Sequence, residues 1–199
     1  MPIQLYHPNK SNLGSACSFN VAPDNSCVFA TLIRQHGWDA EKGNGTFKGN
    51  KDNPEQKVNV KLSLVEVSAI LETLDRKRVY SAYHDADKPK QIKFDVWVDK
   101  ASGSDRGFTF SVNVSDKNNK EYKNSFYFGF NYGEARYVRE YLMFCLKRSF
   151  KSSLSASQSQ DKPFVPVVVA IPKTPTVVYN PEEVAGPTST TDDDLIGDL

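Results

Sequence analysis

Two segments of this chain, 68 residues apart, share one pattern in which alternating apolar residues lead directly into a helix start. In 57–63 the apolar positions hold valine and leucine, and in 125–131 they hold phenylalanine. Each segment ends in an N-cap residue that a glutamate follows three positions later, the spacing of a capping box: Ser63 with Glu66, and Asn131 with Glu134. A shift of 68 residues therefore superimposes the apolar positions, the N-cap residue and the capping glutamate of one segment on those of the other. We therefore predict a duplicated unit of about four strands followed by a helix.

Alternation of apolar and polar residues marks the strands that such a unit needs. The predicted core-facing positions are Val58, Val60, Leu62, Ile92, Phe94, Val96, Val98, Phe108, Phe110, Val112, Val114, Phe126, Phe128 and Phe130. Less regular strands are expected at 17–21, 27–34 and 79–84, with Asx- and Gly-rich turns between strands. The predicted fold class is α+β, a duplicated ββββα unit with two antiparallel sheets packed against two helices.

Each predicted helix has one apolar face and a basic end. The first begins at Ser63, ends in the basic run 75–78, and has its apolar face at Val67, Ile70, Leu71 and Leu74. The second begins near Asn131, closes with Lys147 and Arg148, and has its apolar face at Val138, Tyr141, Leu142 and Cys145. Cations near the carboxyl end of a helix are favourable because that end carries partial negative charge.

The composition changes after Phe150. Residues 151–160 are polar and serine-rich, which is typical of a linker, and six of the 11 prolines fall in the last 49 residues. Residues 1–150 carry 22 Lys and Arg against 17 Asp and Glu, whereas 151–199 carry three against seven. We therefore predict a basic, polyanion-binding domain at 1–150 and a Pro-rich linker with an acidic tail at 151–199; the alternative is that the charges are ordinary solvated surface charges. The apolar stretch 164–171 departs from this disordered pattern and is expected either to dock as an edge strand or to contact a partner.

The sequence lacks the residue patterns of catalysis. Its three cysteines have no C-x-x-C spacing, its three histidines lack metal-ligand spacing, and the glycines at 43–49 lack the ending of a phosphate-binding loop. We predict no enzyme activity, no cofactor and no metal. The N-terminus shows no signal segment and no apolar run approaches about 18 residues, so the expected location is the cytoplasm.

Binding chemistry is better represented. If the Phe, Val and Ile positions face the core, the opposite positions of the same strands present lysines and aromatic rings to solvent. Unpaired bases stack on such rings, and the cations follow the phosphates. The residues predicted to contact single-stranded nucleic acid are Phe29, Arg34, Trp38, Lys57, Asn59, Lys61, Lys93, Trp97 and Tyr127. Tyr80 and Tyr83 are secondary candidates; the alternative for every one of these residues is packing beneath a helix or between subunits.

Three segments give the chain a resemblance to a known family. They are Trp38-Asp39, the strand-to-helix segment 57–70 with Leu62-Ser63 and Glu66-Val67, and the second junction at 126–146. Over roughly residues 15–150 the chain resembles the Whirly family of single-stranded-DNA-binding proteins and the related coactivator-type fold. The resemblance implies paired strand-strand-strand-strand-helix units, binding of single-stranded DNA and assembly into a homo-oligomer.

A second resemblance concerns the C-terminus. The last eight residues place aspartates before a few apolar side chains and look like the acidic tail of bacterial and phage single-stranded-DNA-binding proteins: Asp192, Asp193, Asp194, Leu195, Ile196, Asp198 and Leu199. Such tails imply docking of replication and recombination partners, with the acids steered to a basic pocket and the apolar residues buried. The alternative is an acidic end that only increases solubility. The implied location is the cytoplasm of a bacterium or of a phage-infected cell.

These features together predict a non-enzymatic single-stranded-DNA-binding protein of replication, recombination or repair, whose tail recruits partner proteins and which does not contact a membrane. One alternative is an RNA-binding or annealing protein on the same fold, which competition between DNA and RNA oligomers would separate. Another is a structural or assembly protein, in which the exposed rings are interfaces between subunits.

Overall fold

The structure, a computed structural model, describes residues 2–158. The apolar stretch 164–171 and the acidic tail 192–199 lie outside the described residues. Within 2–158 no helix has the length and apolar character needed to cross a bilayer.

The first unit forms a four-stranded antiparallel sheet in the order β1-β2-β3-β6, followed by helix α1. Its elements are β1 Ile3–His7, β2 Ser15–Val21, β3 Cys27–Arg34, β6 Lys57–Ser63 and α1 Leu64–Arg76. Between β3 and β6 the chain forms a small hairpin and a helical turn: β4 Gly37–Asp39, β5 Asn44–Thr46 and η1 Lys48–Asn50.

The second unit repeats this order, with an antiparallel sheet β10-β9-β8-β7 and then helix α2. Its elements are β7 Tyr80–His84, β8 Lys90–Val98, β9 Asp105–Ser115, β10 Lys123–Phe130 and α2 Tyr132–Gln158. The duplicated ββββα unit predicted from the sequence is confirmed.

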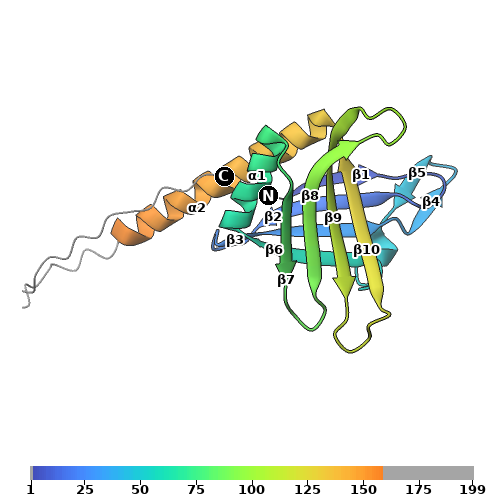
Figure 1. The fold of residues 1–199 in the computed structure, drawn as a ribbon, viewed down its shortest axis with the longest axis horizontal. Helices are drawn as coiled ribbons and strands as arrows, with labels where there is room; N and C mark the ends of the chain where they lie inside the picture. Colours follow the sequence, from blue (N-terminus) through green and yellow to red (C-terminus); the bar gives the residue numbers. More distant parts are fainter. Residues whose placement is uncertain (1, 159–199) are drawn as a thin grey trace, which may run out of the picture. The chain divides into compact units, whose positions relative to one another are not determined.

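One core lies between the two sheets and under both helices. Figure 1 shows the second sheet in front, with the strands of the first sheet running across behind it. Phe19 of the first sheet and Phe110 of the second are in ring contact, with centroids 6.0 Å apart. Val67 of α1 and Leu142 of α2 are fully buried in the same cluster. Each sheet therefore buries one face in this shared core and leaves its other face to solvent, on opposite sides of the core.

Both predicted capping boxes are present. The Glu66 carboxylate accepts a hydrogen bond from the backbone N–H of Ser63 at 2.8 Å, and the Ser63 hydroxyl accepts from the Glu66 N–H at 3.3 Å. At α2 the same pair of bonds joins Asn131 and Glu134, each at 2.9 Å. These bonds satisfy N–H groups that the first turn of a helix leaves unpaired, which is why each strand can pass directly into its helix.

A histidine from the opposite unit completes each capping box. His84, the last residue of β7, contacts the Glu66 carboxylate of the first unit at 2.7 Å. His7, the last residue of β1, contacts the Glu134 carboxylate of the second unit at 2.6 Å. The two units are thus joined reciprocally, each helix start being held by the first strand of the other unit.

The second helix is longer than the sequence pattern predicts. It continues past Lys147 and Arg148 to Gln158, into the stretch expected to be a linker. The Ser152 and Ser153 hydroxyls donate to the Ser149 carbonyl at 2.8 and 3.1 Å, so these serines bond to the helix backbone rather than interrupt it.

One predicted core position is wrong. Val98 is 47% exposed, because the pairing of β8 with β9 shifts register between Trp97 and Val98. The strand opposite Trp97 holds Gly107, whose φ of 137° suits glycine and not other residues. Because of this bulge, the alternation of core-facing and outward-facing residues in β8 ends at Trp97, which lies on the outer face, and Val98 does not return to the core.

Candidate nucleic-acid interface

The outward positions predicted from the strand pattern face solvent, but they lie on two different surfaces. The first is the outer face of the β1-β2-β3-β6 sheet, here termed the lysine face and defined by Phe29, Lys57, Asn59 and Lys61. Phe29 is 39% exposed and pairs with Lys61 across β3 and β6. The four strands of this sheet contain no Asp or Glu, so nothing within them neutralises the lysines.

The second surface is the outer face of the β10-β9-β8-β7 sheet, here termed the tryptophan face and defined by Lys93, Trp97 and Tyr127. Lys93 and Tyr127 lie in one row, each paired with Ser111 of the intervening strand β9. Tyr127 is 50% exposed, and its partial burial raises its pKa above the ordinary value. Trp97 and Tyr127 line one open depression of about 630 Å³.

The position of the Trp97 ring depends on a glycine. A Cβ placed on Gly129 of β10 would lie 3.1 Å from Cζ3 of Trp97, closer than most such contacts. The indole therefore reaches across β9 and lies over Gly129, which it covers, while Trp97 itself stays partly exposed. Glycine at 129 thus makes room for a flat ring on the sheet surface.

The charges of the tryptophan face are partly neutralised. Lys93 pairs with Asp95 at 2.7 Å, and Arg106 pairs with Asp99 at 2.6 Å. Hydrogen bonds from Ser102 lower the pKa of Asp99, so this carboxylate stays ionised. Within residues 2–158 no ion pair is found for Lys123, which stands at the start of β10 next to the sheet surface.

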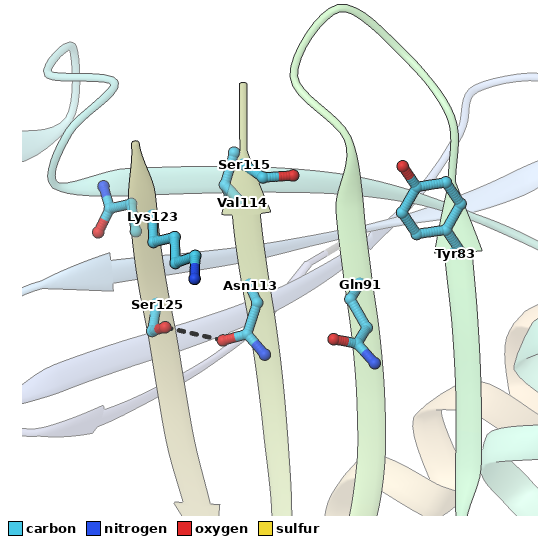
Figure 2. A pocket seen from close by; sticks show the side chains of 8 residues that line it. Tyr83, Gln91, Asn113, Val114, Ser115, Lys123 and Ser125 are labelled. Carbon is cyan, nitrogen blue, oxygen red and sulfur yellow. Dashed lines mark hydrogen bonds between the residues drawn. The ribbon is translucent and has the colours of Figure 1, made fainter. Parts of the chain in front are cut away.

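A second depression of about 580 Å³ lies at the Tyr83 end of the same face. Figure 2 shows Tyr83, Gln91, Asn113 and Ser125 side by side on four neighbouring strands, with Lys123 beside them. Of these residues, Tyr83 alone is predicted from the sequence to contact nucleic acid, as a secondary candidate. The missed residues alternate with the core-facing positions of their strands in the same way as Lys93 and Tyr127. This alternation is the sequence signal that could have identified them.

Arg34 lies at the edge of the tryptophan face, where it lines a depression of about 230 Å³ with Ser125 and Tyr127, and Trp38 lies outside both faces. The Arg34 guanidinium donates to the Asn124 side chain at 2.7 Å and to the Ser125 and Glu55 carbonyls at 2.6 and 3.1 Å. It also lies 4.7 Å above the Phe126 ring, so it ties the end of β3 to β10. These contacts give Arg34 a structural role at the junction of the sheets.

Trp38 lies in the small hairpin, where it pairs with Gly45 and is partly buried. The nine predicted residues therefore divide into four on the lysine face, three on the tryptophan face, Arg34 at the edge of the tryptophan face, and Trp38 in the hairpin. Within 2–158 no group of three or more side chains is placed to hold a metal ion.

The described residues thus form two four-stranded sheets, a small hairpin and two α-helices, with an aromatic and basic sheet surface. No protein-family model matches the sequence, and no curated protein matches it. The fold is similar to that of WHY3 from Arabidopsis thaliana, with a TM-score of 0.54 and 14% identity over 81% of this chain and 95% of that chain.

Two further solved structures show the same fold. WHY1 from Arabidopsis thaliana gives a TM-score of 0.53 and 14% identity over 80% of this chain and 93% of that chain. The plant transcriptional regulator PBF-2 gives a TM-score of 0.54 and 13% identity over 81% of this chain and 88% of that chain. The Whirly-like fold implied by the sequence resemblance is therefore confirmed.

Proposed function

We propose that this chain is a single-stranded DNA-binding protein of replication, recombination or repair that catalyses no reaction. The observation that carries the proposal is the tryptophan face, where the partly exposed Trp97 and the half-exposed Tyr127 line one depression together with Lys100 and Arg106. A structural neighbour is described as a plant transcriptional regulator, which agrees with a nucleic-acid ligand.

The chemistry of this face favours unpaired bases over a duplex. Each base stacked on an aromatic ring contributes about 1–3 kcal/mol, and a double helix keeps its base faces inside the stack. Trp97 and Tyr127 would each receive a base, while Lys93 and Lys123 would follow the phosphates. The lysine face, with Phe29, Lys57, Asn59 and Lys61, would act as a second basic surface on the other side of the core.

The proposal includes two further elements that rest on the sequence. The acidic tail, 192–199, would recruit replication or recombination proteins, because its aspartates and apolar end suit a basic pocket with an apolar floor. The chain would also act as a homo-oligomer, as the resemblance to the Whirly family implies.

Two tyrosines of nearly equal exposure provide a matched test. Tyr127 is 50% exposed on the tryptophan face, and Tyr137 is 51% exposed on α2, outside both faces. Binding of a labelled oligothymidylate is measured by fluorescence anisotropy for the full chain and for Tyr127→Ala and Tyr137→Ala. The loss of one stacked base should weaken binding of Tyr127→Ala about 5- to 150-fold and leave Tyr137→Ala unchanged.

Equal affinities of the two variants would contradict the assignment of this face. Absence of binding by the unaltered chain, or binding that does not weaken with salt, would contradict the function itself, because phosphate contacts release counterions.

A further inference from the structure

One row of side chains crosses the whole second sheet at its Tyr83 end. Tyr83 pairs with Gln91, Gln91 pairs with Asn113, and Asn113 pairs with Ser125 in the strand register. All four point to the outer face and line the depression of about 580 Å³ (Figure 2). Neighbouring strands are about 4.8 Å apart, so the row spans about 14 Å, enough for one nucleotide with its base and phosphate.

The row offers a ring and an unused amide next to each other. Tyr83 is 63% exposed, which leaves its ring face open for stacking. The Gln91 amide has no hydrogen-bond partner within residues 2–158, so its oxygen and nitrogen are both available to a ligand. Gln91 is the direct neighbour of Tyr83 on the next strand, so a base lying on the ring would bring its edge to the amide.

The other side of the row is held in place by an internal bond. The Ser125 hydroxyl donates to Asn113 Oδ1 at 2.8 Å, which leaves the Asn113 nitrogen as a donor on the side away from Ser125 (Figure 2). Lys123 reaches along the same depression and supplies a positive charge for a phosphate. Ring, amide, fixed donor and cation thus line one concave surface, the arrangement that a single nucleotide of a strand requires.

We infer that this row is a base-reading subsite that favours adenine in a bound single strand, a selectivity that rests on the proposed function. Purines present the larger ring face to Tyr83. Of the two purines, adenine pairs its N6 and N7 with the oxygen and nitrogen of an amide such as Gln91, whereas guanine presents two acceptors that suit Arg or Lys. The subsite would add a preference at one position to an otherwise sequence-tolerant surface.

The test compares three oligomers of equal length on the full chain: oligothymidylate, the same oligomer with adenine at regular intervals, and the same oligomer with guanine there. The adenine oligomer should bind about fivefold tighter or more than oligothymidylate, since a good bidentate pair contributes at least ~1 kcal/mol. Gln91→Ala should abolish this preference.

The matched control is Gln4→Ala, because Gln4 is an exposed glutamine on β1, in the other sheet, and its loss should leave the adenine preference intact. Equal binding of adenine and thymine oligomers, tighter binding of guanine, or an adenine preference that survives Gln91→Ala would each overturn the inference while the proposed function stands. If the unaltered chain binds none of the three oligomers, the proposed function fails as well.

Discussion

Glu66 offers a stringent test of how the two units are joined. One oxygen of its carboxylate accepts from the Tyr80 hydroxyl and from His84 Nε2, both at 2.7 Å. The other accepts from the Ser63 N–H at 2.8 Å and from the Ser63 hydroxyl at 2.9 Å. Partial burial by itself would raise the pKa of Glu66, but the hydrogen bonds from His84, Ser63 and Tyr80 outweigh it and lower the pKa to about 2.

The expected effect follows from that shift. A fall from the ordinary 4.5 to about 2 corresponds to about 3 kcal/mol at neutral pH. Solvent screening reduces this to about 2 kcal/mol, because one fifth of the side chain, 20%, is exposed. Since the folded-state pKa is lowered, the stabilisation is complete above pH 4.5 and is lost as the pH falls from 4.5 toward 2.

The substitution Glu66→Gln removes the charge and retains an acceptor for the cap. Urea unfolding of the variant should give a free energy about 2 kcal/mol lower than the unaltered chain at pH 7, and the difference should shrink steadily below pH 4.5. Glu72→Gln on the same helix is the control, because Glu72 makes exposed ion pairs with Arg76 and Arg78 and should change stability little at any pH. A Glu66→Gln difference that is the same at pH 7 and near pH 2 would refute the reasoning.

Three further outcomes are expected. Gly107→Ala should lower the free energy of unfolding, measured in urea, by about 3 kcal/mol or more, because φ is 137° and a Cβ would lie 2.0 Å from the Phe130 carbonyl oxygen. Gly103→Ala is the control: its φ is 68° but a Cβ would meet open space, so the variant should cost about 1 kcal/mol. Arg34→Ala should cost about 2 kcal/mol, and Arg34→Lys should not restore it, because one ammonium cannot reach all three acceptors. Deletion of 192–199 should retain or tighten DNA binding in anisotropy while abolishing capture of partner proteins; a large loss of DNA affinity would refute the tail assignment.

The strands that the sequence predicts best are those with the simplest burial. Phe108, Phe110 and Val112 alternate strictly because one face of β9 lies wholly in the core. The first strand was missed because its inward positions include His7, a polar residue. His7 stacks on the Phe128 ring at 4.4 Å and bonds to Glu134, contacts that depend on a segment more than a hundred residues away.

The sequence predicted which side chains of the candidate site face solvent, but not which of the two sheets each of them belongs to. Alternation predicted that Lys61 and Trp97 point outward, but it carries no information on which strands become neighbours, so residues of two separate surfaces were grouped together. Gln91 and Asn113 were missed because amides are common on any solvated strand. Their alignment beside Tyr83 appears once the register of three strand pairs is known.

The central claim is that Trp97 lies on an open surface that receives unpaired bases. The chain has two tryptophans, so Trp38→Phe leaves Trp97 as the only indole fluorophore. The account predicts that titration of this variant with a single-stranded oligomer changes the Trp97 fluorescence to saturation and more weakly at higher salt, while the same sequence as a duplex changes it little. Fluorescence that does not respond to the single strand, or that responds equally to the duplex, would contradict it.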